Sequence, residues 1–146
     1  MDPFERYPGG GRVPLGRPRN TSDSRRGYGL EVIRLSGSSL CAYCGVDLLS
    51  DYYRWLLLQV DHVVPRSVAQ VHRIDKVLCE DFINLVLACS GCNGLENQYS
   101  VPIEGGGIWT IENFVNFREK VFAARFAKIA VRRSNELAFF QGISLI

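Results

Sequence analysis

Two Cys-x-x-Cys pairs constrain the fold of this chain more than any other feature of its sequence. Cys41 and Cys44 form the first pair, and Cys89 and Cys92 form the second. Each pair presents two sulfurs on one side of a tight turn, and four thiolates match the tetrahedral coordination that zinc prefers. An iron–sulfur cluster or a redox-active pair also uses cysteines, but two such turns, each beside an expected strand, favour zinc. We therefore predict a structural zinc site that joins the two ends of residues 45–88.

The composition limits the class of protein. The chain has 146 residues, of which 47% are hydrophobic, and a formal net charge of +2. This is ordinary for a globular domain, and the charge alone does not indicate a nucleic-acid partner. No run of eighteen apolar residues predicts a membrane span, and the N-terminus has no apolar signal segment. We expect a cytoplasmic protein (or one of the nucleoid or nucleus), not a secreted one, with reduced cysteines. The fifth, Cys79, is interpreted as a small buried side chain.

The chain is predicted to hold one domain preceded by an arm. Residues 1–28 are rich in Gly, Pro, Arg and Ser and show no apolar periodicity, which predicts a flexible arm. The domain itself is expected to span 29–146, with a motif core at 41–100 and a helical part at 108–141.

Within the motif core we expect two strands. The apolar runs predict them near 55–60 and 85–88. Residues 67–83 are mixed and predict either a short helix or an irregular loop. A weak helix is expected from 90 to about 99.

A long helix is predicted over 111–141, because this segment contains neither Pro nor Gly and Thr110 is a suitable N-cap. Apolar side chains at helical spacing are expected to pack on the core: Ile111, Phe114, Val115, Val121, Phe122, Phe126 and Ile129. Three arginines recur every seven residues: Arg118, Arg125 and Arg132. We interpret them as side chains lying along aromatic rings. The alternative is a stripe that binds nucleic-acid phosphates.

The apolar end of the chain, LAFFQGISLI, also has two interpretations. We expect it to pack on the core as the end of the helix. The alternative is an interface for a protein partner or for a second copy of the chain, because exposed apolar patches often mark interfaces.

Asp61 and His62 are neighbours inside an apolar run between the two cysteine pairs. Adjacent residues of a strand point to opposite faces, and a buried charge without a partner costs several kcal/mol. This pair therefore needs a partner, a metal ion or a solvent-filled cleft.

The segments CAYC, VDHVVPRS and INLVLACSGCN, in this order, resemble the HNH endonuclease family. The resemblance covers residues 41–93. It implies an α+β fold, with a small ββα-metal (His-Me finger) core clamped by the four-cysteine zinc site, to which we add the long C-terminal helix. It also implies a metal-dependent endonuclease that hydrolyses DNA phosphodiester bonds, by nicking or by double-strand cutting. An RNA substrate is compatible with the same chemistry, because such a site acts on a phosphate.

The resemblance implies a role for each motif residue. His62 corresponds to the general base that deprotonates the attacking water, and Asp61 to a ligand of the catalytic divalent ion. Asn93 corresponds to a second ligand, and Asn84 to the residue that ties the loop together and helps orient the base. The implied cofactors are a structural Zn²⁺ and a catalytic Mg²⁺ or Mn²⁺, which oxygen ligands suit. Arg66 is a further candidate for binding a phosphate.

Two other functions stay open at this stage. The chain could be a zinc-containing module that binds nucleic acid or protein without cleavage, although such a module does not need the Asp-His-Asn set. It could also be a nuclease subunit that is silent until a partner docks. The family often has Lys or Arg just after its final motif residue, whereas this chain has Gly94 and Glu96 there. We therefore expect this element to bind the DNA backbone more weakly.

Overall fold

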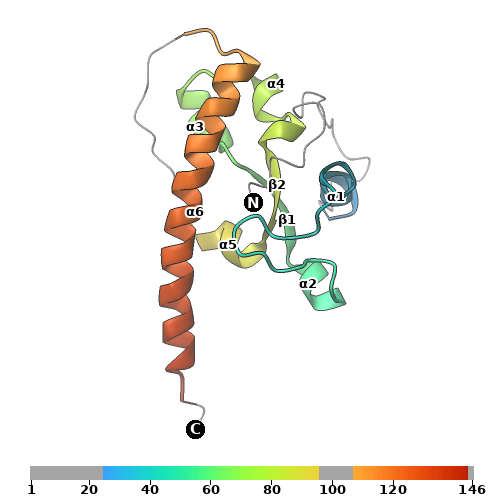
Figure 1. Cartoon of the computed structure of the whole chain (residues 1–146), viewed down its shortest axis with the longest axis vertical. Helices are drawn as coiled ribbons and strands as arrows, with labels where there is room; N and C mark the ends of the chain where they lie inside the picture. The colour runs from blue at the N-terminus through green and yellow to red at the C-terminus, as the bar shows by residue number, and fades with distance from the viewer. Residues whose placement is uncertain (1–24, 96–106, 145–146) are drawn as a thin grey trace.

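The structure is a computed structural model that describes residues 25–95 and 107–144 (Figure 1). In chain order its elements are η3 (Arg25–Gly29), α1 (Leu30–Ser36), α2 (Tyr52–Leu56), β1 (Leu58–His62), α3 (Arg66–Val71), α4 (Lys76–Cys79), η4 (Phe82–Asn84), β2 (Leu85–Cys89), α5 (Ser90–Leu95) and α6 (Ile111–Gln141). Figure 1 shows short helices around one small sheet, with α6 running along one side and extending past it. The predicted α+β class is confirmed.

Strands β1 and β2 form a two-stranded antiparallel sheet. Their register runs from Leu58 opposite Cys89 to His62 opposite Leu85. The strand predicted at 85–88 is confirmed and extends by one residue. The strand predicted at 55–60 begins later, because the Asp51 side chain accepts a hydrogen bond from the backbone N–H of Arg54 and caps the helix α2. Asp61 and His62 therefore both lie inside β1.

The helices α3 and α4 and the 3₁₀ turn η4 lie in the connection between the strands, so the helical alternative for residues 67–83 is correct. The side chain of Asp75 accepts a hydrogen bond from Val77 N–H at the start of α4. Asp81 accepts one from Ile83 N–H at the start of η4. Each carboxylate binds an N–H that has no partner within its helix, and this fixes where the chain turns back into β2.

Helix α6 begins after Thr110, as predicted, and the structure adds a capping box there. The side chain of Thr110 accepts a hydrogen bond from Asn113 N–H, and the Asn113 side chain binds the backbone N–H of Thr110. Only the first half of the helix is packed. Its buried residues are Phe114, Phe117, Arg118, Val121, Arg125 and Ile129. Ile111 and Phe126 were expected on the packed face, but their exposed fractions are 39% and 43%.

The second half of α6 extends into solvent. Every described residue from 130 to 144 is exposed, including Phe139 at 76% and Phe140 at 69%. The expectation that the apolar end packs on the core is therefore wrong for these residues. Figure 1 shows this half projecting beyond the sheet and the short helices.

Two apolar clusters make up the core, and α6 contributes to both. One surrounds the sheet and the cysteines and includes Leu48, Leu58 and Ile129. The other lies among α3, α4 and α6 and includes Val64 and Phe114. The packed half of α6 thus joins the strands to the connection between them.

The N-terminal boundary lies earlier than predicted. Residues 25–29 form the π-helical turn η3, where Arg25 Nη1 donates a hydrogen bond to the carbonyl of Leu56 (3.0 Å). The Arg25 guanidinium also lies 5.1 Å from the centre of the Trp55 ring. Residues 25–28 therefore belong to the fold, while the rest of the predicted arm lies outside the described residues. The predicted helix beyond residue 95 lies outside them as well.

Among the helices of the described residues, none is long and apolar enough to cross a membrane.

Candidate active site and metal centre

The four paired cysteines meet at one end of the sheet. The Sγ atoms of Cys41, Cys44, Cys89 and Cys92 all lie within 4.8 Å of one another. Those of Cys44 and Cys89 are 3.8 Å apart. A tetrahedral zinc site with Zn–S bonds of about 2.3 Å separates its sulfurs by about 3.8 Å. The cluster is therefore positioned to hold a metal ion, and its geometry fits zinc.

The backbone of the two turns sets this arrangement. Gly45 has a φ of +75°, which favours glycine, and its N–H donates to the carbonyl of Cys41 (2.9 Å). Ala42 N–H donates to the carbonyl of Leu87 (2.8 Å) and ties the first turn to β2. The backbone N–H of Cys89 points at the Cys41 sulfur (3.3 Å). Hydrogen bonds from the Cys89 and Cys92 side chains lower the pKa of the Cys41 thiol, so a thiolate is favoured there.

Cys79 lies apart from this cluster, as predicted. It is 3% exposed, and burial raises the pKa of its thiol to about 11. The thiol is therefore neutral near pH 7 and packs as a small apolar group.

Asp61 is buried in an ion pair rather than open to a cleft. Arg125 Nη1 lies 2.9 Å from its Oδ2, and Arg125 Nη2 donates to its Oδ1 at 3.3 Å. The Tyr43 hydroxyl also donates to Oδ2 (2.5 Å). Arg125 is 1% exposed, and its Nη1 donates to the carbonyls of His62 and Val63, both at 2.9 Å. One guanidinium from α6 thus neutralises Asp61 and fixes the end of β1.

Asn93 lies on the same side of β1 as Asp61, because its Nδ2 donates to Oε1 of Gln59 (2.7 Å) and residues 59 and 61 share a face. However, the Asn93 amide is held by Gln59, and both Asp61 oxygens are held by Arg125. In the described part of the chain, the cysteine cluster is the only group of three or more His, Cys or carboxylate side chains placed to hold an ion. In this arrangement the donor set does not fit a catalytic divalent ion.

His62 points to the opposite face, toward the connection between the strands. Its Nε2 lies 3.2 Å from Oε2 of Glu80, and the His62 side chain keeps 21% of its surface exposed. Glu80 also accepts two hydrogen bonds from Arg66, from Nε at 2.6 Å and from Nη2 at 3.1 Å. The bond from Arg66, helped by the one from His62, lowers the pKa of the Glu80 carboxyl to about 2. Sequence reasoning missed Glu80, since no motif position marks it.

Asn84 ties this region together. It is fully buried, accepts a hydrogen bond from Val64 N–H (2.9 Å) and donates to the carbonyls of Val64 (3.1 Å) and Cys79 (2.8 Å). These bonds join the residues that follow β1 to the end of α4, directly before Glu80. None of these bonds reaches His62, so any effect of Asn84 on the ring acts through the loop.

The comparison with protein families found a match in this part of the chain. Residues 41–98 match the family model of the HNH endonucleases. Neither the curated proteins nor the solved structures gave a match to the chain. The HNH region, residues 41–98, includes both cysteine pairs and all the motif residues discussed above. Nuclease-type activity is what this family implies for the chain.

Arg125 lies outside the HNH region, and its placement corrects part of the predicted phosphate-binding stripe. Arg118 is 3% exposed, and its Nη1 donates to the carbonyl of Ile83 (2.8 Å). Arg125 and Arg118 therefore bind backbone inside the core and do not face a phosphate at the surface. Arg132 is exposed, and so is most of the Arg66 side chain, so these two stay predicted phosphate contacts.

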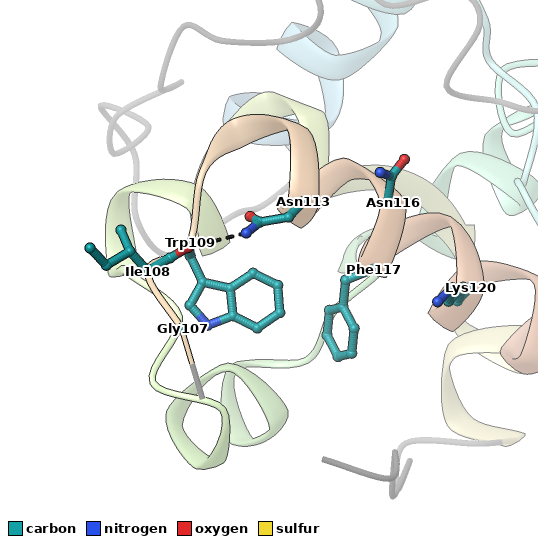
Figure 2. Close-up of a pocket in the computed structure, with 7 residues that line it drawn as sticks. All are labelled: Gly107, Ile108, Trp109, Asn113, Asn116, Phe117 and Lys120. Atoms are coloured by element: carbon teal, nitrogen blue, oxygen red, sulfur yellow. Dashed lines mark hydrogen bonds between the residues drawn. The ribbon is translucent and has the colours of Figure 1, made fainter. Parts of the chain in front are cut away.

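A cavity of about 240 Å³ also lies outside the HNH region, at the start of α6 (Figure 2). The residues that line it are Gly107, Ile108, Trp109, Asn113, Asn116, Phe117 and Lys120. The Trp109 and Phe117 rings lie with their centres 5.2 Å apart, and Trp109 Nε1 donates to the carbonyl of His72 (2.9 Å). The cavity shares no residue with the cysteine cluster or with the surroundings of His62. His72 packs on Phe117 and takes no part in either site.

Proposed function

We propose that this chain is an HNH endonuclease that hydrolyses DNA phosphodiester bonds, with His62 as the general base. The observation that carries the proposal is the placement of His62 in the HNH region. Its ring is partly exposed and held by Glu80, whereas its neighbour Asp61 is buried and neutralised. A neutral imidazole, with an ordinary pKa of about 6.5, accepts a proton from water near neutral pH. His62 would therefore take a proton from a water molecule, whose oxygen bonds to phosphorus while the bond from phosphorus to the leaving oxygen breaks.

The four cysteines support a structural role for zinc. Their sulfurs lie within 4.8 Å of one another, and three of the four residues are buried. We propose that Zn²⁺ held there fixes one end of the sheet and takes no part in the reaction, because a site closed by four protein ligands leaves no position for water.

The predicted catalytic Mg²⁺ or Mn²⁺ has no free carboxylate at Asp61 in this arrangement. Such an ion, when bound, stabilises charge on the phosphate and the leaving oxygen. Asp61, its predicted carboxylate ligand, is occupied by Arg125 at 2.9 Å. Binding of an ion at Asp61 therefore requires that Arg125 first leaves the carboxylate.

This same contact favours a second candidate, a nuclease subunit that is silent until a partner docks. The arginine that occupies Asp61 belongs to α6, and the second half of α6 exposes Phe139 and Phe140. A partner that binds this half could act on the helix that carries Arg125. A homodimer through the same helix is the other form of this candidate.

The test is the conversion of supercoiled plasmid to nicked and linear DNA. The zinc-loaded protein is first freed of other divalent ions and then assayed without addition, with Mg²⁺ and with Mn²⁺. We expect cleavage by the native chain and its loss, by a factor of about 100 or more, in His62→Ala, because general-base catalysis contributes about 10²–10⁴-fold. His72→Ala, at the other histidine of the chain, is the matched control and keeps activity.

The outcomes separate the candidates. Equal cleavage by the native chain and His62→Ala contradicts the role of His62. No cleavage by a folded, zinc-loaded native chain favours the silent subunit or the binding module. Binding of a labelled DNA duplex or RNA by that same sample then separates a nucleic-acid-binding module from a subunit that needs a protein partner.

A further inference from the structure

We propose that Glu80 is a positioning residue for His62: its carboxylate accepts the Nε2–H of the ring, so that Nδ1 carries the lone pair that takes the proton from water. The inference rests on the proposed function and deepens it. It adds a residue from outside the family motif, contributed by the connection between the strands.

The contact has the geometry of an orienting hydrogen bond. Nε2 of His62 lies 3.2 Å from Oε2 of Glu80, and both side chains are mostly buried, at 21% and 24% exposed. A neutral imidazole has one N–H and one lone pair, and the partner of one nitrogen decides which nitrogen holds the proton. A carboxylate at Nε2 can only accept, so it selects the tautomer with the proton on Nε2.

Glu80 is itself held in place from two sides. Arg66 donates hydrogen bonds to both carboxylate oxygens, from Nε to Oε1 (2.6 Å) and from Nη2 to Oε2 (3.1 Å). These two bonds fix the plane of the carboxylate. The backbone before it is fixed by Asn84, which donates to the carbonyl of Cys79. Glu80 N–H donates to the carbonyl of Lys76 (2.9 Å). A residue held this firmly can orient a neighbouring ring.

The backbone of His62 is fixed as well. Its carbonyl accepts a hydrogen bond from Arg125 (2.9 Å), while its ring binds Glu80. The charged groups around the ring are Glu80 with Arg66 on its own face and the Asp61–Arg125 pair on the opposite face of β1. The negative charge next to the ring therefore comes from Glu80, because Asp61 is already neutralised.

The first test reads the tautomer directly and needs no cleavage. Nitrogen-15 NMR of the histidine-labelled, zinc-loaded protein is recorded at a pH well above 6.5, where a free imidazole is neutral. We expect His62 to carry its proton on Nε2 in the native chain. In Glu80→Ala we expect the two tautomers to exchange. Glu80→Gln keeps an acceptor oxygen and should recover part of the preference.

The control is Glu31→Gln, which makes the same chemical change in another Glu–Arg pair, between Glu31 and Arg34 on α1. It should leave the His62 signals unchanged. A native ring protonated on Nδ1, or a tautomer ratio that is the same in Glu80→Ala, overturns the proposal whether or not the chain cleaves DNA.

The second test uses the plasmid assay. Glu80→Ala should lower kcat by about 10–100-fold, a part of what general-base catalysis contributes, and change KM by less than about twofold. The kcat of Glu80→Gln should lie between those of Glu80→Ala and the native chain.

A fall in kcat for Arg66→Gln should not add to that of Glu80→Ala, because both changes act on one carboxylate. An effect on KM alone, or full additivity, contradicts positioning. If the native chain shows the expected tautomer but no cleavage, the proposed function is contradicted, while the orienting contact between Glu80 and His62 is supported.

Discussion

The two ends of one small sheet are built in different ways. At the cysteine end, Leu58 pairs with Cys89. Each Cys-x-x-Cys pair forms a turn of fixed length there, and the two turns bring the four sulfurs together. At the histidine end, where His62 pairs with Leu85, the polar groups arrive from separate elements. Glu80 comes from the connection between the strands, and Arg125 comes from a helix that begins after the HNH region. The cysteine end is positioned to hold a metal ion, whereas the histidine end is held by contacts between residues far apart in the sequence.

The largest effect is expected from loss of the metal at the cysteine end. Structural zinc contributes about 10–16 kcal/mol in small zinc peptides, which is as much as the whole stability of a typical domain. Chelation, or Cys44→Ser, should therefore abolish cooperative unfolding, measured by circular dichroism during heating. Cys79→Ala, which removes a thiol outside the cluster, is the control and should still melt cooperatively. A metal-free chain that melts like the loaded one would show that the sulfurs do not hold the fold.

The next effect is expected from Arg125→Ala at the histidine end. It leaves Asp61 buried without its cation, and such a change costs about 3–5 kcal/mol. Urea denaturation of the zinc-loaded protein measures it. Arg132→Ala, on the exposed part of the same helix, should change stability by less than about 0.5 kcal/mol. If Arg125→Ala costs less than about 1 kcal/mol, then Asp61 finds another partner and the ion pair does not hold this end.

A smaller effect is expected from Asn84→Ala. The change leaves Val64 N–H and the carbonyl of Cys79 buried without this partner, at a cost of about 1–3 kcal/mol for each unsatisfied group. Urea denaturation should show a loss of about 2–6 kcal/mol. Asn116→Ala, at an exposed position, is the matched control. A loss as small as that of the control would mean that the loop holds Glu80 in place without Asn84.

The smallest effect concerns acid. The pKa of Glu80 is lowered from 4.5 to about 2 in the folded chain, mainly by Arg66. A lowered carboxyl pKa stabilises the fold above the unfolded value, and this stabilisation is lost as the pH falls from 4.5 toward 2. Glu80→Gln should therefore lower Tm at pH 6 and flatten its fall between pH 4.5 and pH 2.5. Glu31→Gln, in an exposed pair, should have a smaller effect at pH 6. Parallel curves for Glu80→Gln and the native chain would contradict the assignment.

Sequence alone predicts the cysteine end well, because the spacing within each pair determines its turn. It also predicts β2 and the bounds of α6, where caps and the absence of Pro and Gly are local signals. The seven-residue spacing correctly places Arg118 and Arg125 on one side of α6. It does not show that this side meets the carbonyls of Ile83, His62 and Val63, which need donors where the sheet ends. The buried guanidinium groups of Arg118 and Arg125 donate to these carbonyls. The seven-residue arginine spacing, which is also compatible with phosphate binding, therefore stabilises the core at these two positions.

The histidine end is harder to predict for the same physical reason. Glu80 lies 18 residues from His62, and Arg125 lies 64 residues from Asp61. No local rule fixes such separations. The sequence indicated only that Asp61 and His62 needed partners, and the resemblance supplied an ion for one of them. In the structure, the partner of Asp61 is instead the guanidinium of Arg125 from the same chain.

The exposed half of α6 has a consequence for dynamics. Helices shorter than about 12–15 residues are marginal in water, because the first turn is costly to form. Residues 130–141 have no core contact of their own, so they are helical because the packed half of α6 provides their nucleus. Opening should therefore proceed from Gln141 inward, one turn at a time. Backbone amide hydrogens of this half should exchange with solvent through local opening of the helix. Those near Val121 should exchange only when the domain unfolds.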